Sequence, residues 1–183
     1  SLGDPGMRYR MYFLGHDCRQ RLLIAASERP EYPLSTAVAN DDRGADPMFF
    51  TGALLVDDTA RRLLTFSKLR DTSETVTAWA RCCDTPLASD HPFYEGNAIL
   101  AHADVSNVTT TCPMEPQYYD FASDFPADKV SALPVLPLPI VFNFVSNPEE
   151  IEGESMAAFV KAMRVPKAPQ YTEAPYQTFE QLR

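Results

Sequence analysis

The sequence of 183 residues is short of features that several common protein classes require. No apolar run comes near the roughly 20 residues that a membrane-spanning helix needs, and the amino terminus shows no hydrophobic signal core. Basic residues number 16 against 25 acidic ones, and the resulting net charge of −9 repels nucleic acid and anionic membrane surfaces. We therefore expect a soluble, acidic, intracellular protein of the cytoplasm that binds neither nucleic acid nor membrane.

Glycine and cysteine are also scarce. The seven glycines form no glycine-rich phosphate loop and no Gly-x-Ser-x-Gly turn, which disfavours nucleotide-dependent and α/β-hydrolase chemistry. Four cysteines in a chain of this length are too few for a disulfide scaffold. Because 45% of the residues are hydrophobic, the chain can bury a core without disulfides or metal. A zinc ion would therefore be optional for folding.

What the sequence does contain is a series of short alternating or apolar runs, which indicate β-strands. These runs are residues 8–14, 21–26, 48–56, 62–66, 75–80 and 97–105. The third and fourth are separated by Asp-Asp-Thr-Ala-Arg, whose length and turn chemistry predict a β-hairpin. In the last run, Ile99 and Ala101 alternate with Leu100 and His102. The middle of the chain therefore predicts an antiparallel meander.

The rest of the chain is dominated by proline and polar residues. Residues 29–47 predict a loop, and residues 140–145 predict a buried strand. Only residues 149–164 predict a helix, with glutamates near its start and an apolar stripe along one side, and residues 165–183 predict an extended tail that wraps the domain. The sequence thus predicts one mainly β domain of antiparallel strands, with its core at about residues 8–145.

The histidines and cysteines fall into two groups that could form a zinc site. His16 and Cys18, in Gly-His-Asp-Cys-Arg, could supply two ligands from a connection between strands, and Cys82 and Cys83 could supply the others. Adjacent cysteines point to opposite faces of a strand, so both can bind one ion only if the chain turns there, which the following Asp-Thr-Pro permits. The alternative is that all four cysteines are buried as small hydrophobic side chains.

The same region could also supply a thiol nucleophile and a histidine that acts as its general base. Cys82 or Cys83 could be activated by His91 or His102, provided that the pair lies within about 3 Å in the folded chain. The alternative is that His91 is a turn residue before a proline and that His102 is bonded or solvated on a strand face. The aromatic segment at residues 117–125 could rim a pocket or form a self-association patch.

The stretch Val-Thr-Ala-Trp-Ala-Arg-Cys-Cys-Asp-Thr-Pro-Leu-Ala resembles the second zinc knuckle of the glutathione-dependent formaldehyde-activating family, which includes the centromere protein V group. Gly-His-Asp-Cys-Arg stands where that family opens with Gly-x-Cys-x-Cys-Gly. The resemblance covers residues 12–104, about half of the chain, and implies a β fold like that of the family.

The zinc motifs of that family are degraded here. Cys83 matches the second cysteine of the knuckle, but Ala80 stands at the first and Asp84 replaces the glycine. In the opening motif, His16 replaces the first cysteine and Cys18 matches the second. The family's middle Cys-x-Cys-x-x-Cys should fall within residues 29–49, which contain neither cysteine nor histidine. The resemblance therefore implies the fold without its catalytic metal.

From these patterns we expect a non-catalytic binding or interaction module with no cofactor or one structural zinc. Its partner would be a protein or a small apolar or thiol-bearing ligand. The alternative is a carbon-sulfur lyase-like or thiol-dependent enzyme that uses Cys18, Cys82, Cys83 and His102. A third hypothesis is an assembly subunit that grips other copies through the tail and forms a homo-oligomer.

Overall fold

The computed structural model describes residues 7–28, 44–54, 58–105, 108, 110, 114–133, 140, 154–164 and 177–183. Its strands are β1 (Met7–Arg10), β2 (Tyr12–Phe13), β3 (Pro47–Thr51), β4 (Ala53–Leu54), β5 (Leu64–Ser67), β6 (Val76–Ala80), β7 (Thr85–Asp90), β8 (Ala98–His102), β9 (Tyr119–Asp120) and β10 (Gln177–Thr178). Its helices are α1 (His16–Glu28), α3 (Asp58–Arg62), α4 (Ala127–Val130), α5 (Glu154–Arg164) and α6 (Phe179–Leu182), with 3-10 turns η1 (Pro92–Tyr94) and η2 (Ala122–Asp124).

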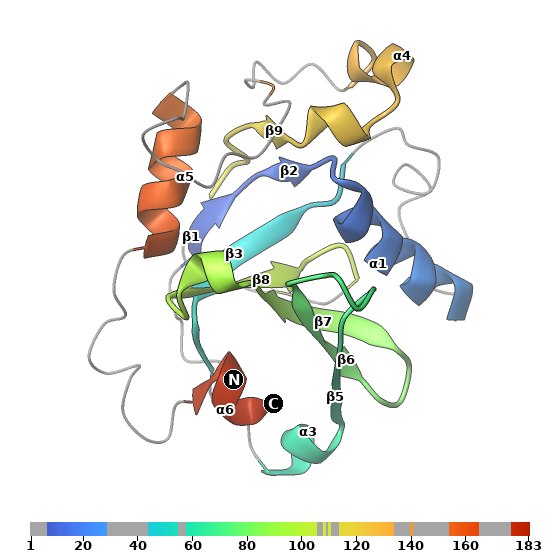
Figure 1. Cartoon of the computed structure of the whole chain (residues 1–183), viewed down its shortest axis with the longest axis vertical. Coiled ribbons are helices and arrows are strands. Elements are labelled where there is room, and N and C mark those ends of the chain that lie inside the picture. Colours follow the sequence, from blue (N-terminus) through green and yellow to red (C-terminus); the bar gives the residue numbers. More distant parts are fainter. Residues whose placement is uncertain are drawn as a thin grey trace.

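A six-stranded sheet in the order β1-β3-β8-β7-β6-β5 forms the centre of the molecule (Figure 1). All of its neighbouring strands are antiparallel. Strands β5 to β8 follow one another as a meander, while β1 and β3 complete the sheet on the side of β8. Two short pairs lie outside this sheet: β2 with β9, in parallel, and β10 with β4, antiparallel. The predicted mainly β, antiparallel fold is confirmed.

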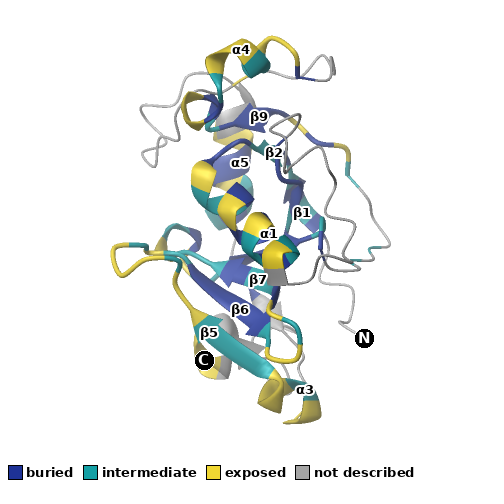
Figure 2. Cartoon of the chain, turned by 90° about the vertical axis from the view of Figure 1, so that its right-hand side faces the viewer, coloured by how far each residue is buried: buried dark blue, intermediate teal, exposed yellow. Residues whose placement is uncertain are grey.

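The two faces of the sheet carry different apolar clusters. Leu100 faces the cluster that includes Tyr9, Phe49 and Phe159, whereas its neighbour Ile99 belongs to a cluster on the opposite face, with Phe50, Val76 and Ala78 among its members. This alternation is the one predicted for residues 97–105, although the strand itself ends at His102. Figure 2 shows strand β6 largely buried, while its neighbour β5 at the sheet edge is partly exposed.

Helices α1 and α5 contact the sheet at separate places. Helix α5 packs on β1 and buries Phe159, Val160 and Met163, and helix α1 packs on β7. In Figure 1, helix α5 lies to the left of the sheet and helix α1 to its right. No helix in the described part of the chain has the length and apolar character needed to cross a bilayer.

The strand predicted at residues 21–26 is wrong, because this segment lies inside helix α1. Cys18, Leu22 and Ala25 recur at helical spacing and pack together with Ala45 and Val105. Gly-His-Asp-Cys-Arg therefore opens a helix and does not connect two strands. Asp124 supports this start, since its carboxylate accepts a hydrogen bond from the backbone N–H of His16 at 3.3 Å.

The predicted hairpin between residues 48–56 and 62–66 is also wrong. Strand β3 lies beside β1 and β8, whereas β5 lies at the far edge beside β6. The intervening segment forms helix α3, with Asp58 in its first turn and Arg61 and Arg62 in its last, an order that complements the helix dipole. Strand β7 was not predicted at all. Its Pro86 sits opposite Trp79 where the register shifts, and such irregularities accommodate proline within a sheet.

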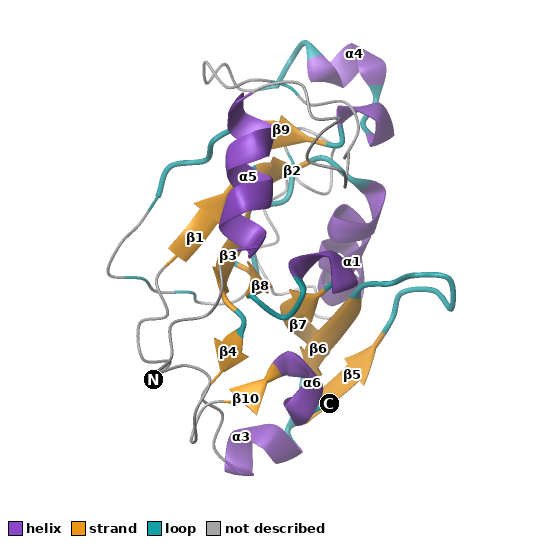
Figure 3. Ribbon diagram, turned by 60° about the vertical axis from the view of Figure 1, so that its left-hand side comes forward, coloured by secondary structure: helices purple, strands orange, loops and turns teal. Residues whose placement is uncertain are grey.

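Among the later elements, helix α5 agrees with prediction, whereas the extended tail predicted at residues 165–183 contains a short helix, α6. Helix α5 falls within the helix predicted at residues 149–164. The end of the predicted tail, residues 177–183, forms β10 and α6 against the chain's own β4, as Figure 3 shows. Residues 29–43, 134–139, 141–153 and 165–176, together with Cys112, lie outside the described residues, so most of the predicted loop, the strand at 140–145 and the first part of the tail lie there too.

Candidate functional site

A cavity of about 610 Å³ opens between helix α1, the sheet and helix α5. Its walls come from β2, from the first turns of α1, from the connection between β5 and β6, from η1 and η2, and from one residue of α5. The lining residues are Phe13, Gly15, His16, Asp17, Cys18, Arg21, Arg70, Thr75, Ser89, His91, Phe93, Tyr94, Leu100, Phe121, Asp124 and Phe159. This volume is typical of small-molecule binding sites.

Five of the sixteen residues that line the cavity are phenylalanine or tyrosine. Phe13 stacks on Phe121 with their ring centroids 5.3 Å apart, and Phe93 stacks on Phe159 at 6.3 Å. Leu100, which is buried in β8, contributes from the sheet. These side chains favour an apolar or aromatic body in the cavity over a strongly hydrated one.

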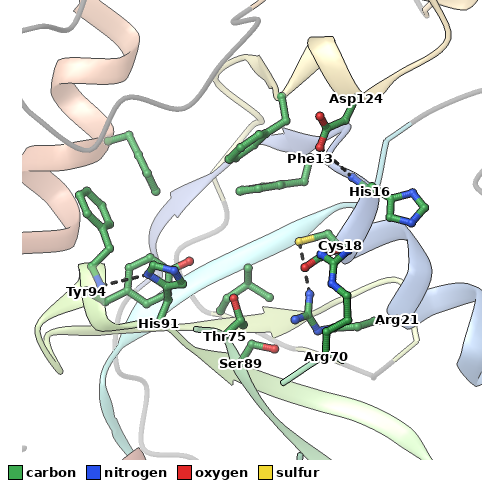
Figure 4. Close-up of a pocket in the computed structure, with 16 residues that line it drawn as sticks. Phe13, His16, Cys18, Arg21, Arg70, Thr75, Ser89, His91, Tyr94 and Asp124 are labelled. Carbon is green, nitrogen blue, oxygen red and sulfur yellow. Dashed lines mark hydrogen bonds and ion pairs between the residues drawn. The ribbon is translucent and has the colours of Figure 1, made fainter. Parts of the chain in front are cut away.

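Arg21 forms the cationic part of this wall. It projects from α1 toward the sheet, is only 1% exposed, and donates from Nε to the Thr77 hydroxyl at 2.8 Å. One amino group lies 4.0 Å from the sulfur of Cys18, and the other has no hydrogen-bond partner among the described residues. Figure 4 shows Arg21 and Cys18 together on one side of the cavity, with His91 and Tyr94 on the other.

A chain of buried hydroxyl groups continues from Arg21 across three strands. The Thr77 and Ser89 hydroxyl oxygens are 2.8 Å apart, and Ser89 lies 2.8 Å from His102 Nε2. Arg21 Nε can only donate, so the Thr77 hydroxyl is the acceptor in that bond. Either hydroxyl can donate between Thr77 and Ser89, and the direction of the bond between Ser89 and His102 depends on the tautomer of the ring. Burial, and to a smaller extent the charge of Arg21, lowers the pKa of His102 to about 3, so this imidazole is neutral at neutral pH.

No carboxylate among the described residues pairs with the buried guanidinium of Arg21. Among the described residues, only the Nε–H group of its five N–H donors meets an oxygen. Taking a charge out of water costs several kcal/mol, and proteins usually offset this cost with a counter-ion. The structure therefore contains a buried cationic site whose natural complement is an anion.

A buried acid, Asp120, lies in β9 beside the cavity residue Phe121. Asp120 is fully buried, and its Oδ1 accepts a hydrogen bond from the Phe121 backbone N–H at 2.8 Å, whereas its Oδ2 has no partner within the described chain. Burial raises the pKa of Asp120 to about 7, although that hydrogen bond acts in the opposite direction. Near neutral pH this carboxyl group is thus protonated for much of the time.

Polar residues at the mouth of the cavity already have partners. Arg70 forms an ion pair with Asp17, joining the connection before β6 to the start of α1. His91 Nδ1 accepts a hydrogen bond from the Phe93 backbone N–H at 3.0 Å, and its Nε2 lies 3.5 Å from the carboxylate of Glu74. Burial lowers the pKa of His91, while Glu74 raises it to a smaller extent.

The proposed nucleophiles and zinc ligands are separated by the fold. His16 and Cys18 lie in the first turns of α1, at the cavity, whereas Cys82 and Cys83 lie in the turn between β6 and β7. Burial raises the pKa of the Cys18 thiol to about 11, which keeps it protonated and weakly nucleophilic. His102 bonds to Ser89. Within the described residues no three His, Cys, Asp or Glu side chains converge on a position that could hold a metal ion.

Sequence reasoning missed Arg21, Ser89 and Tyr94, which give the cavity much of its polar character. A signal for Arg21 was present. With helical spacing, Arg21 falls on the same face as Cys18, Leu22 and Ala25, so a charged residue interrupts an otherwise apolar stripe. Ser89 carried no such signal, because its partners come from other strands.

No family model, no curated protein and no solved structure matches this chain. The resemblance to the formaldehyde-activating family therefore stays a prediction.

Proposed function

We propose that this chain is a non-catalytic binding module whose cavity takes a small apolar or aromatic carboxylate. The ligand's carboxylate binds the guanidinium of Arg21, and its apolar body lies among the aromatic side chains. The observation that carries this proposal is the buried Arg21, which is 1% exposed and has no carboxylate partner among the described residues.

The chemistry of the wall narrows the ligand class. A guanidinium group can bind a planar carboxylate through two parallel N–H donors. A strongly hydrated anion such as inorganic phosphate would gain little from walls built by Phe13, Phe93 and Phe121. A neutral apolar molecule would leave Arg21 without a counter-charge. A carboxylate on an apolar body satisfies both parts of the cavity.

This proposal needs neither a metal nor a thiol reaction. The alternative of a thiol-dependent enzyme gains no support from the cavity, because the raised pKa of Cys18 keeps its sulfur protonated. A fold like that of the formaldehyde-activating family, with at most one structural zinc, remains compatible with a binding role. Arg21 is then the residue on which function depends.

Calorimetric titration with 3-phenylpropionate, indole-3-acetate and decanoate, each beside its neutral amide, tests the proposal. We expect at least one acid to bind at least tenfold more tightly than its amide. In an Arg21→Met variant this preference should disappear, because the cation is gone. An Arg62→Met variant, which changes an exposed arginine, should keep it.

The same Arg21→Met variant separates a binding role from a structural one. Replacing even a buried ion pair by apolar side chains of similar volume is often neutral or stabilising by about 1 to 4 kcal/mol, and a buried charge without a counter-ion has less attraction to lose. We therefore expect a higher free energy of unfolding in urea for the variant together with weaker acid binding. A variant that loses stability, or acids that bind no better than their amides, would contradict the proposal.

A further inference from the structure

The turn between β6 and β7 holds two cysteines side by side at the surface. The backbone N–H groups of Cys83 and Asp84 both donate to the carbonyl of Ala80, at 3.2 and 2.8 Å. Asp84 adopts a left-handed conformation with φ of 48°, which completes the reversal of the chain. Cys82 is exposed and Cys83 is half-buried, so reagents in solution can reach the pair.

Within this turn the two thiols face each other. The Sγ atoms of Cys82 and Cys83 are 3.3 Å apart, although the side chains of adjacent residues in a strand would point to opposite faces. The Thr85 hydroxyl donates to the Cys83 sulfur at 3.2 Å. This donor stabilises negative charge on the sulfur, because a hydrogen bond to the charged form favours that form.

Zinc does not account for this arrangement. Tetrahedral Zn²⁺ with Zn–S bonds of roughly 2.3 Å would hold two sulfurs about 3.8 Å apart and would need further ligands. No third His, Cys, Asp or Glu completes such a group in the part of the chain that is described. The pair therefore has the geometry of a two-sulfur site that reacts by itself.

We infer that Cys82 and Cys83 form a redox site, which closes into a disulfide between adjacent residues by exchange with a small disulfide such as oxidised glutathione. In the first step the Cys82 thiolate attacks one sulfur of the oxidant, forms a mixed disulfide and expels one glutathione thiolate. In the second step the Cys83 thiolate, which the Thr85 hydroxyl stabilises and whose proton has passed to water, attacks the Cys82 sulfur and expels the second glutathione thiolate. The protein loses two hydrogen atoms, and one oxidised glutathione becomes two reduced molecules. This inference is independent of the proposed ligand cavity.

The closed form should be easily reduced. Adjacent Cα atoms are about 3.8 Å apart across a trans peptide, below the roughly 4.4 Å at which ordinary disulfides begin. Such strain makes a disulfide labile, as regulatory disulfides are. The site is therefore expected to open and close with the thiol-disulfide balance around it, without serving as a permanent link.

Mass spectrometry of the full chain tests this inference. In a Cys112→Ser background, which removes the fourth cysteine, oxidised glutathione should produce a protein lighter by two hydrogens that resists alkylation at Cys82 and Cys83. Dithiothreitol should restore both thiols. With Cys83→Ser added, the reaction should stop at a stable glutathione adduct on Cys82. With Cys18→Ser added instead, the closed pair should form as in the parent.

Three results would overturn the inference. One is a glutathione adduct on Cys82 that persists in the parent, which would mean that Cys83 does not complete the exchange. Another is a disulfide that joins Cys18 to either turn cysteine in tandem spectra of the oxidised peptides. The third is unchanged alkylation of both turn cysteines after oxidation.

Discussion

At the scale of single residues, Asp120 links the interior of the molecule to pH. Burial raises its pKa to about 7, against about 4 in an unfolded chain. Between these values the folded chain holds a proton that the unfolded chain has released, so this residue lowers the free energy of unfolding as the pH rises from about 4 to about 7. The effect is complete above pH 7 and absent below pH 4.

We expect the Asp120→Asn variant to lose this dependence, because the amide carries no charge at any pH in the window. Relative to the parent, its free energy of unfolding in urea should rise between pH 4 and pH 7 by an amount on the order of 4 kcal/mol at most. An Asp128→Asn variant, altered at an exposed position of α4, serves as the control. Parallel curves for parent and Asp120→Asn would show that Asp120 is not the responsible group.

His102 acts with the opposite sign. Its pKa is lowered to about 3, against about 6.5 when unfolded, so between pH 3 and pH 6.5 the unfolded chain binds a proton that the folded chain does not. The stability that comes from keeping this ring neutral is present above pH 6.5 and lost as the pH falls. From about pH 4 to pH 6.5 the contributions of Asp120 and His102 therefore offset each other.

At the scale of elements, helix α5 is the clearest case of stability from packing. Phe159 is 1% exposed and lies between Tyr9, at 5.4 Å between ring centroids, and Phe49, at 5.2 Å. A Phe159→Ala variant should unfold in urea with a free energy about 3 to 5 kcal/mol below the parent's. Lys161→Ala, on the exposed side of the same helix, should change it little, and equal losses in both variants would contradict this account.

The sequence predicts correctly those strands whose alternation of residues is visible within the strand itself. Residues 76–80 and 98–102 alternate with the period of a strand, and both form strands. Residues 21–26 were misread because Leu22, Leu23, Ile24 and the following alanines form a run too short to separate strand from helix by apolar content alone. The decisive period extends back to Cys18, beyond the segment that was read as a strand.

Strand β7 and the cavity depend on partners that lie far along the chain. Pro86 suggests a turn when read alone, and only the irregular pairing with β6 makes it part of a strand. Likewise, Ser89 becomes a polar cavity residue because Thr77 and His102 are brought beside it. The aromatic segment at 117–125 left a pocket rim, a self-association patch and simple core cover as alternatives. Phe121 lines the cavity, whereas Tyr118, Tyr119 and Phe125 are buried in the core.

At the scale of the whole molecule, residues 177–183 connect strand β4 with helix α3. Strand β10 pairs with β4, and Arg61 donates to the Gln181 carbonyl at 3.1 Å. Deleting residues 177–183 should lower the free energy of unfolding by about 1 to 3 kcal/mol, because these hydrogen bonds each contribute roughly 0.5 to 1.5 kcal/mol.

Light scattering on that shortened chain also tests the hypothesis of an assembly subunit. If the tail grips other copies, the deletion should convert a fixed oligomer into monomers. If residues 177–183 only pair within their own chain, the mass in solution should stay the same while stability falls. Unchanged stability would show that the pairing of β10 with β4 contributes nothing to the fold.

The strand order has a consequence for how the chain reaches this structure. Strands β5 to β8 pair with their immediate successors, so each pairing closes only a short loop, whereas β3 must find β8 with β4 to β7 between them in the sequence. Closing long loops costs more entropy and is slow. We therefore expect the meander to assemble first and to serve as the template on which β3 and then β1 are added, with the amino-terminal strands the last to join and the first to detach.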